Sequence, residues 1–364
     1  MTQNKGSDKT NATEEKRVAF RRFIVFVALM AAFLWLMFRY GTGNVETDVE
    51  KSARAFTLVV WSILMEALPF VLLGTIISSL IQLFVSEDTI LKVLPKNNIC
   101  RLGLASLLGL IFPVCECAII PITRALIRKG MPVGPAMAFM LATPIVNPVV
   151  LLSTYNAFPA MPEMVLYRGV FGFVGAVAIG YVVGRAADQA ILKDHTLACG
   201  CAHDHHKGHS EAACTHIHHH APKGAKAIIS QVLAHTSAEL KNVGMYLIFG
   251  AMIASCMQIF VPKELLFAVG SGRVSSIGIM MALAFVLSLC SEADAFIANT
   301  FLLHFSGASV LAFLMTGPMI DIKNTMMLFG SFNHRFVIKV ISIILLVCLI
   351  LALIASFIMG GAYA

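Results

Sequence analysis

The chain has 364 residues, of which 58% are hydrophobic and 13% are charged, and its mean hydropathy is +0.82. Soluble domains carry about 25% charged residues, so this composition argues against a soluble enzyme and indicates a membrane protein. The net charge of +7 is modest and lies mainly at the ends of apolar runs, which is typical of cytoplasmic loops rather than of a nucleic-acid surface.

The first apolar run covers about 20–39 and follows Lys16, Arg17, Arg21 and Arg22. No small-residue cleavage site follows it, so we expect a retained helix rather than a signal peptide. The basic residues favour a cytoplasmic N-terminus. The nine cysteines lie in apolar runs or in one His-rich segment, which does not suggest a secreted disulfide framework. We expect a multi-pass protein of the plasma (inner) membrane with an all-α fold.

The remaining apolar runs fall on either side of a polar segment. Several of them reach the roughly 20 residues that cross ~30 Å of hydrocarbon. The predicted organisation is a cytoplasmic N-terminus with a first transmembrane helix (1–54), a first membrane repeat (55–186), a His/Cys-rich polar loop (187–226) and a second membrane repeat (227–364). The runs lie near 55–85, 102–121, 134–155, 163–184, 240–261, 273–298, 308–330 and 335–359.

The two halves resemble one another in sequence. Residues 70–85 (FVLLGTIISSLIQLFV) align with residues 246–261 (YLIFGAMIASCMQIFV) at a constant offset of 176, with six identities in sixteen positions. In each half an apolar run then ends in cysteine and acid, and a proline-broken span follows, ATPIVNPVV at 142–150 and MTGPMIDIK at 315–323. These matches in the same order indicate an internal repeat, as many transporters have.

The direction of the repeats depends on the segment 102–130. If every apolar run crosses the membrane, the repeats are parallel and the basic stretch at 123–130 faces outward, against the positive-inside tendency. If the segment enters and returns as a hairpin broken at Pro113 and Pro121, that stretch is cytoplasmic and the repeats are inverted. We favour the inverted arrangement, in which each half crosses three times and the broken backbone faces protein or a water-filled cavity.

The motif Cys115-Glu116-Cys117 lies inside an apolar run that is bounded by prolines. A charge at mid-bilayer costs about 2.5–3.5 kcal/mol, so Glu116 must face protein or water and be protonated, bind a cation, or pair with a basic residue such as Arg124. Thiolates are soft ligands that suit Cu(I), Zn and, by extension, trivalent arsenic. Residues two apart point about 200° away from each other on a helix, so chelation by both thiols requires extended backbone. Alternatively, the cysteines pack as small hydrophobic residues.

The second half adds more ionisable groups. Cys290, Glu292 and Asp294 lie in one apolar run, and Asp321 and Lys323 lie in the next. Charges in apolar runs are costly unless they line a pathway. Asp321 and Lys323 also suit mutual neutralisation or a helix end.

The first half offers uncharged groups instead. Thr143 and Asn147, in the sequence TPIVNP, are able to coordinate a ligand or to cap a broken helix, and backbone carbonyls near Pro144 and Pro148 could do the same. Glu66 is another acid in an apolar run and is a candidate proton carrier.

The segment 195–220 contains nine of the twelve histidines and three cysteines. Clusters of imidazole and thiol bind Zn, Cu or Ni, but the spacing is not that of a zinc finger. A loop that collects zinc or another soft metal and a dispensable polar linker therefore both stay open. The predicted metal ligands are Cys199, Cys201, His203, His205, His206, His209, Cys214, His216, His218, His219 and His220.

With these motifs identified, the sequence resembles the ArsP/YraQ-like predicted permease family over about 55–359. The resemblance implies a permease, and for the members similar to ArsP it implies efflux of trivalent arsenicals that depends on membrane cysteines. The His/Cys-rich loop is not expected of every member and raises divalent metals as substrates. The residues that carry the resemblance are Cys115-Glu116-Cys117, Pro121, Gly130, Pro132, Thr143-Pro144, Asn147-Pro148 and, in the second half, Cys290, Glu292 and Asp294.

The leading hypothesis is a secondary, proton-coupled efflux permease for a soft, thiophilic solute such as a trivalent arsenical or a heavy-metal ion. The thiols would bind the solute near the midplane, and the acids would balance charge or exchange protons. No phosphate-binding loop or catalytic constellation is present, so we do not expect an enzyme. The predicted site residues are Cys115, Glu116, Cys117, Thr143, Asn147, Cys290, Glu292, Asp294 and Asp321.

Two other classes stay open. A membrane thiol-disulfide oxidoreductase could relay electrons through Cys115 and Cys290, since exchange needs only a reachable pair. A zinc- or copper-type metal transporter, or a metal-dependent subunit, could use the loop at 195–220. The expected partners are the lipid bilayer and the solute or metal, without nucleic acid, and a homo-oligomer is left open.

Overall fold

The computed structural model describes residues 45–86, 90, 94–95, 97–111, 114–186, 192, 225–260 and 272–362. The predicted first span at 20–39 and the His/Cys-rich segment at 195–220 lie outside these residues. The chain divides into two compact units, residues 1–58 and 59–364. The second unit holds every predicted site residue that the structure describes.

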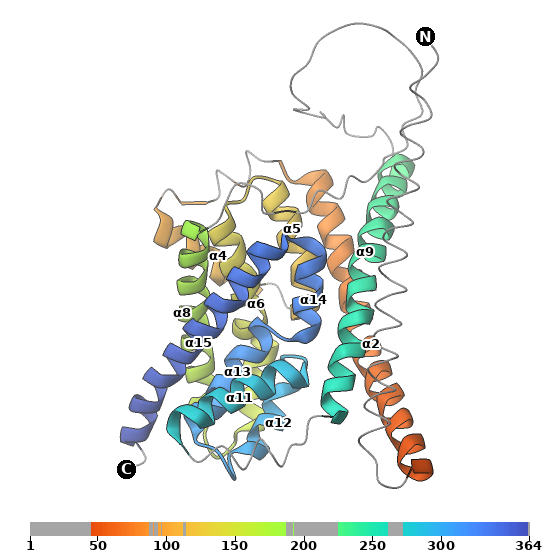
Figure 1. The fold of residues 1–364 in the computed structure, drawn as a ribbon. Helices are drawn as coiled ribbons and strands as arrows, with labels where there is room; N and C mark the ends of the chain where they lie inside the picture. The colour runs from red at the N-terminus through yellow and green to blue at the C-terminus, as the bar shows by residue number, and fades with distance from the viewer. Residues whose placement is uncertain are drawn as a thin grey trace, which may run out of the picture. The chain divides into compact units, whose positions relative to one another are not determined.

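The described chain is helical, which confirms the predicted all-α class (Figure 1). Long helices alternate with groups of short ones because polar or extended residues interrupt several of the apolar runs. The helices in chain order are α2 (Val45–Phe84), α4 (Asn98–Ile111), α5 (Glu116–Arg128), α6 (Val133–Val146), α7 (Pro148–Ala157), α8 (Glu163–Ala186), α9 (Ala225–Phe260), α11 (Arg273–Leu287), α12 (Asp294–Phe301), α13 (Gly307–Met319), α14 (Ile322–Ser331) and α15 (His334–Ala362).

Five segments of the described chain are long and apolar enough to cross a membrane. Their lengths of 24 to 33 residues exceed the roughly 20 residues that a bilayer requires. The prediction of a multi-pass membrane protein is therefore confirmed. The segments are Ser52–Phe84, Val133–Ala157, Glu163–Ala186, Ile229–Ile259 and His334–Met359.

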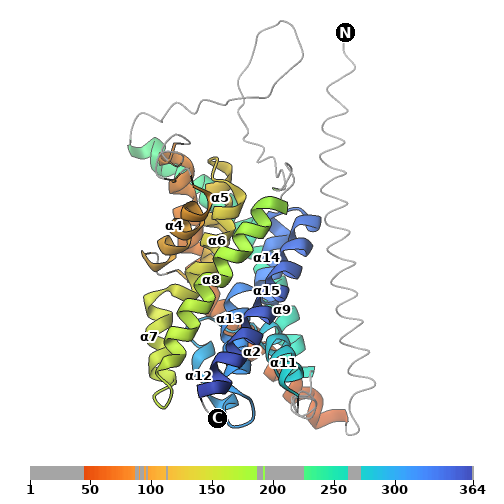
Figure 2. The same ribbon diagram turned by 90° about the vertical axis from the view of Figure 1, so that its left-hand side faces the viewer.

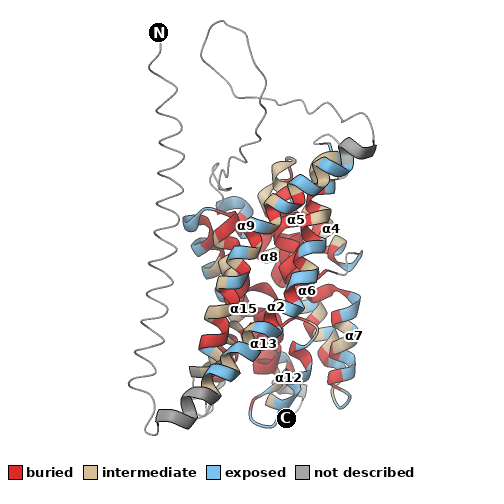
Figure 3. Ribbon diagram, turned by 90° about the vertical axis from the view of Figure 1, so that its right-hand side faces the viewer, coloured by how far each residue is buried: buried red, intermediate tan, exposed pale blue. Residues whose placement is uncertain are grey.

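Burial distinguishes a core of broken helices from long outer helices (Figure 3). In the most apolar window of Val133–Ala157, which is α6 followed by α7, 72% of the residues are buried, against 17% for Ser52–Phe84 and 28% for His334–Met359. The outer faces of the long helices carry large exposed side chains such as Trp61 and Phe357, as lipid-facing helices do. The broken helices form the interior that holds the polar groups.

The segment 102–130 forms two short helices, α4 and α5, joined by a turn that contains Val114 and Cys115. The predicted break at Pro121 is wrong, because Pro121 lies inside α5. A proline in the second turn removes only one backbone hydrogen bond, and neighbouring groups can compensate for it in a buried membrane helix. The break lies before Glu116, and Pro113 is outside the described residues.

The two halves have helices in the same order but in opposite directions. In the part of the chain that the structure describes, each half runs from a long helix through four short ones to a second long helix. Figures 1 and 2 show α2 (from residue 59) and α8 running upward and α9 and α15 running downward. An inverted repeat would have this arrangement, and the repeat itself stays a prediction.

The glycines aligned between the two halves allow short helices to approach long ones. A Cβ atom at Gly74 would lie 2.6 Å from the carbonyl oxygen of Ala118, in the first turn of α5. A Cβ atom at Gly250 would lie 2.7 Å from the Cα atom of Lys323, in the first turn of α14. Only glycine leaves room for these contacts, so both positions help to place the start of a short helix.

Candidate functional site

Two broken helices owe their new starts to capping side chains. Asn147 separates α6 from α7, and its Oδ1 accepts a hydrogen bond from the backbone N–H of Val149 at 3.0 Å. Asp321 separates α13 from α14, and its Oδ1 accepts from the N–H of Asn324 at 2.6 Å. Both are N-cap interactions, which restart a helix by satisfying its first N–H groups. Of the two roles considered for Asn147, the structure displays the cap.

The Cys-Glu-Cys motif begins α5. Cys115 has extended backbone (φ −76°, ψ 171°), and Glu116 is the first residue of the helix. The extended backbone that the motif requires is therefore present. Cys115 and Cys117 are both 2% exposed, and their side chains lie near enough to interact.

Glu116, Asp321 and Lys323 form a central ion cluster that joins the two halves of the chain. The Nζ atom of Lys323 lies 3.2 Å from Glu116 Oε1 and 3.4 Å from Asp321 Oδ2. All three side chains are at most 4% exposed. Two carboxylates and one ammonium give the cluster a net charge of −1, and in this low-dielectric setting their attraction is strong. Lys323 therefore makes the buried Glu116 tolerable.

Ser288 holds the turn between α11 and α12 against this cluster. It has left-handed backbone (φ 48°, ψ 44°) at the end of α11, a conformation that costs a non-glycine residue about 1–2 kcal/mol. Its hydroxyl oxygen accepts from the N–H of Ile322 at 3.1 Å, and its carbonyl oxygen accepts from Lys323 Nζ at 2.9 Å. These two bonds offset the strain and connect the turn to the start of α14.

The same turn contacts Glu116 through the neighbouring Ser291. The Ser291 hydroxyl donates to Glu116 Oε2 at 3.2 Å. The motif of the first half and its counterpart in the second half are therefore in direct contact. Cys290 is 4% exposed, and its thiol donates to the carboxylate of half-buried Glu292 at 3.5 Å.

A clamp formed by Arg168 and Asp294 fixes the other side of this turn. The Arg168 guanidinium donates to both Asp294 carboxylate oxygens, at 2.9 and 2.8 Å, and to the Ser291 carbonyl at 3.1 Å. It also donates to the Thr154 hydroxyl on α7 at 2.8 Å. Asp294 thus neutralises a buried arginine, and such bidentate pairs are the strong ones. The sequence reasoning missed Arg168, although a cation in the apolar run 163–184 was a signal for it.

The sequence analysis named Arg124 as a candidate partner of Glu116, but the structure does not pair these two residues. The Nη1 atom of Arg124 lies 3.4 Å from Glu239 Oε1 on α9, and both side chains are buried. Arg124 stands eight residues after Glu116, which is about 12 Å along a helix, so it reaches a different layer of the protein. Arg124 therefore pairs with Glu239, whereas Lys323 pairs with Glu116 and Asp321.

Most of the predicted site residues lie at the start of α5, in the turn after α11, or at the helix breaks before α7 and α14. They do not form a metal centre. Among the described residues, no three His, Cys, Asp or Glu side chains are placed to hold one metal ion. Thr143 donates to the Phe139 carbonyl in its own helix at 2.7 Å. Glu66 is exposed on α2. The predicted ligands between 195 and 220 lie outside the described chain.

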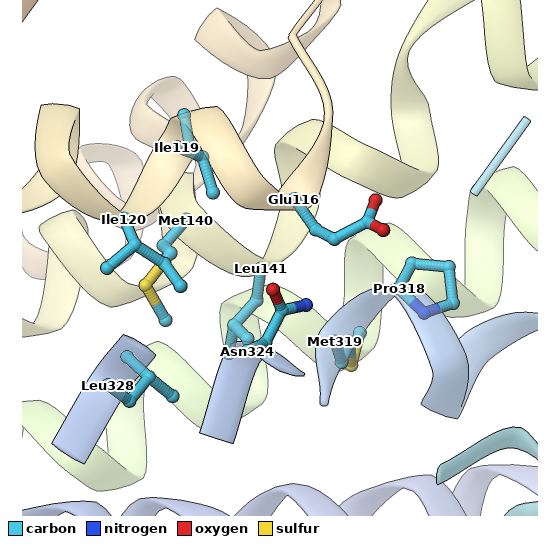
Figure 4. Close-up of a pocket in the computed structure, with 9 residues that line it drawn as sticks. All are labelled: Glu116, Ile119, Ile120, Met140, Leu141, Pro318, Met319, Asn324 and Leu328. Atoms are coloured by element: carbon cyan, nitrogen blue, oxygen red, sulfur yellow. The ribbon is translucent and has the colours of Figure 1, made fainter. Parts of the chain in front are cut away.

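A small pocket opens beside the central ion cluster, with room for about one water molecule. Figure 4 shows Glu116 and Asn324 reaching it from α5 and α14. Two methionine thioethers are also in its wall. The apolar lining residues are Ile119, Ile120, Met140, Leu141, Pro318, Met319 and Leu328.

Buried charges gathered where short helices begin, inside a multi-pass helical protein, are typical of solute transporters. The family model ArsP_1, described as a predicted permease, matches residues 52–357, and the chain belongs to this family. The resemblance inferred from the sequence is confirmed, and the protein is a membrane permease rather than an enzyme.

Two relatives match over most of their length. The UPF0718 protein YcgR of Bacillus subtilis is 44% identical over 289 residues, which is 79% of this chain and 92% of the relative. A Streptococcus mutans protein, named as a candidate subunit of a two-component membrane permease complex, is 40% identical over 293 residues, with the same coverage. YraQ of Escherichia coli is 31% identical over 80 residues, 22% of this chain and 23% of the relative. No solved structure matches the chain significantly.

Proposed function

We propose that this permease is a secondary, proton-coupled exporter of a soft, thiophilic solute such as a trivalent arsenical or a heavy-metal ion. The observation that carries the proposal is Glu116, buried between Cys115 and Cys117 at the start of a helix and in contact with the second half through Lys323 and Ser291. Thiols are the side chains that such solutes prefer. A site where the two halves meet is where secondary transporters bind their substrates.

The acids of the site have different roles in this proposal. Glu116 balances the charge of the bound solute. The solute thereby takes the place of Lys323, the cation that pairs with Glu116 in its absence. Half-buried Glu292, which accepts a hydrogen bond from Cys290, is the proton carrier. Asp294 is excluded from the proton path because both of its oxygen atoms accept from Arg168.

Binding in this proposal is transient. Cys115 is the N-cap of α5 and Cys117 lies in its first turn, whereas Cys290 belongs to the turn after α11. The solute would first bind the pair on α5 and then recruit Cys290 as the two turns approach each other. Two or three thiolates hold a solute weakly enough for release, which a closed cage of four would not.

Transport into inside-out membrane vesicles tests this proposal. Arsenite, methylarsenite, Zn²⁺ and Cu(I) are supplied one at a time, with and without a pH gradient. Uptake of at least one of them should require the gradient and should fall at least about tenfold in Cys115→Ser and in Cys290→Ser, as loss of a metal-site residue commonly costs. The matched control is Cys348→Ser, since Cys348 is equally buried but contacts Met319, on α13.

Three results would contradict the proposal. Uptake in the Cys115→Ser/Cys290→Ser double variant at the wild-type rate would remove the thiols as ligands. An equal loss in Cys348→Ser would make the effect one of packing. A mixed disulfide trapped between Cys115 and a cytosolic thioredoxin, without any uptake, would favour the electron-relay function instead.

A further inference from the structure

Lys323 holds its positive charge inside a buried cage of oxygen atoms. The Nζ atom lies 2.9 Å from the Ser288 carbonyl oxygen, 3.2 Å from Glu116 Oε1 and 3.4 Å from Asp321 Oδ2. The three oxygen atoms belong to three separate segments, namely the turn after α11, the start of α5 and the break before α14. The cage therefore exists only in the folded chain.

A further oxygen atom lies beside this cage. Asn324 is 3% exposed, and its Oδ1 accepts no hydrogen bond from the described residues. Asn324 and Glu116 line the same small pocket (Figure 4). Buried amide oxygen atoms are nearly always paired, so this one is available to a ligand that enters the pocket.

We propose that the cage is a binding site for an alkali-metal cation, and that the Lys323 ammonium occupies it as a tethered substitute. Carboxylate and carbonyl oxygens suit hard cations rather than soft ones. A monovalent ion in place of the ammonium also leaves the net charge of the cluster at −1, which matters at low dielectric.

The lysine is suited to such an exchange. Its ammonium is a point charge on a flexible stem, whereas the Arg168 guanidinium is fixed by a bidentate pair with Asp294. Gly250 allows α9 to lie against the Cα atom of Lys323 and so holds its backbone in place. Movement of the side chain alone would open the cage. A role of the cation in export rests on the proposed function, but cation binding does not.

The full-length protein, purified in detergent, provides the test. Its thermal unfolding is followed in LiCl, NaCl or KCl against choline chloride at equal ionic strength. In Lys323→Met the cage loses its own cation, so at least one alkali ion should raise Tm by several degrees in a saturable manner, because it binds only the folded state. Lys323→Arg, which keeps the charge, should show no such rise. Adding Asn324→Leu or Glu116→Gln to Lys323→Met should reduce it.

Two further variants control for the loss of any lysine and for a failure of Lys323→Met to fold. Lys241→Met removes an exposed lysine on α9 and should not respond to the choice of cation. Asp321→Asn/Lys323→Met restores the net charge of −1 and keeps a capping oxygen at 321, so it should fold and respond even where Lys323→Met alone does not fold.

The inference is overturned if neither Lys323→Met nor Asp321→Asn/Lys323→Met responds to any alkali ion more than to choline. It is also overturned if Lys241→Met responds equally, or if Mg²⁺ or Ca²⁺ gives the larger shift. Because the readout is unfolding, it is independent of export. If an alkali ion raises Tm but the protein exports no thiophilic solute, the cation site is supported and the proposed function is overturned.

Discussion

At the scale of single residues, each fully buried acid of the site is matched to a basic residue, and Glu116 and Asp294 have theirs on another segment. Lys323 serves Glu116 and Asp321, Arg168 serves Asp294, and Arg124 on α5 serves Glu239. Removing one partner of a buried pair leaves an uncompensated charge, which costs far more than the pair itself contributes. The pairs therefore determine which substitutions the fold tolerates.

The Arg168–Asp294 pair gives the clearest prediction at this scale. Arg168→Met and Asp294→Asn should each lower the free energy of unfolding by about 3–5 kcal/mol, because each leaves one buried charge unpaired. The double variant should cost clearly less than the sum of the two. Denaturant titration in mixed micelles measures all three.

Arg185, near the end of the same helix, supplies the control. It is exposed and lies 4.7 Å from the centre of the Tyr181 ring. Arg185→Met should therefore cost no more than about 1 kcal/mol. Equal losses for Arg168→Met and Arg185→Met would show that the clamp does not hold the turn.

The residue types of the site could be predicted from the sequence, but their pairing could not. Acids and thiols in apolar runs are conspicuous, so Cys115, Glu116 and Cys290 were identified in advance. Which cation meets Glu116 depends on how far α5 extends and on where α14 begins, and no sequence spacing specifies that. Arg124 was the nearest cation in sequence, yet it lies about 12 Å along the helix from Glu116.

At the scale of elements, the site depends on how closely short helices approach long ones. The first turns of α5 and α14 hold Glu116 and Lys323, and each turn lies against a glycine of a long helix. A side chain at Gly74 would push the first turn of α5 away from α2, and one at Gly250 would push the first turn of α14 away from α9. The geometry of the central ion cluster is therefore fixed partly by residues that carry no charge.

Gly250→Ala should separate α14 from α9. Its Cβ atom would lie 2.7 Å from the Cα atom of Lys323, which is backbone and cannot rotate away. We expect a loss of about 1–3 kcal/mol in the free energy of unfolding, as for other overpacked sites, together with reduced vesicle uptake.

Gly244→Ala, on the same helix, is the matched variant. A Cβ atom there meets nothing within 4 Å. Alanine is the better helix former by about 1 kcal/mol, so this variant should be neutral or stabilised and should retain uptake. If the two variants behave alike, the close approach at Gly250 does not matter.

The breaks in the helices were predictable to within a few residues. Asn147 and Asp321 are polar residues within three positions of a proline in apolar runs, and both turned out to be caps. The misplaced break at Pro121 shows the limit of the proline signal. Pro144 and Pro318 also lie inside helices, α6 and α13, because a buried neighbourhood can compensate for one lost hydrogen bond.

At the scale of the whole membrane unit, basic residues gather at the helix ends on one side. Arg128 and Lys129 end α5, Arg185 ends α8 and Arg335 begins α15, and these ends lie on the upper side in Figures 1 and 2. Of the loops on the other side that the structure describes, 158–162 and 302–306 contain no Lys or Arg. From the positive-inside rule we predict that the upper side faces the cytoplasm.

Cysteine labelling tests this orientation. In a background with Cys100, Cys199, Cys201 and Cys214 changed to serine, a membrane-impermeant maleimide should label Lys129→Cys only in inside-out vesicles. Ala160→Cys and Leu303→Cys, in the loops of the other side, should react only in right-side-out vesicles. Labelling of all three from one side would rule out the arrangement with inverted halves.

The contact between Glu116 and Lys323 also sets a delay during synthesis. The two residues are 207 positions apart (323 − 116), and at about 5–20 residues per second a ribosome needs about 10–40 s to pass from one to the other. During that interval the first half is in the bilayer without the cation that neutralises it. An unpaired charge is costly in the bilayer core, so the buried position of Glu116 is complete only after Lys323, at the start of α14, has been synthesised.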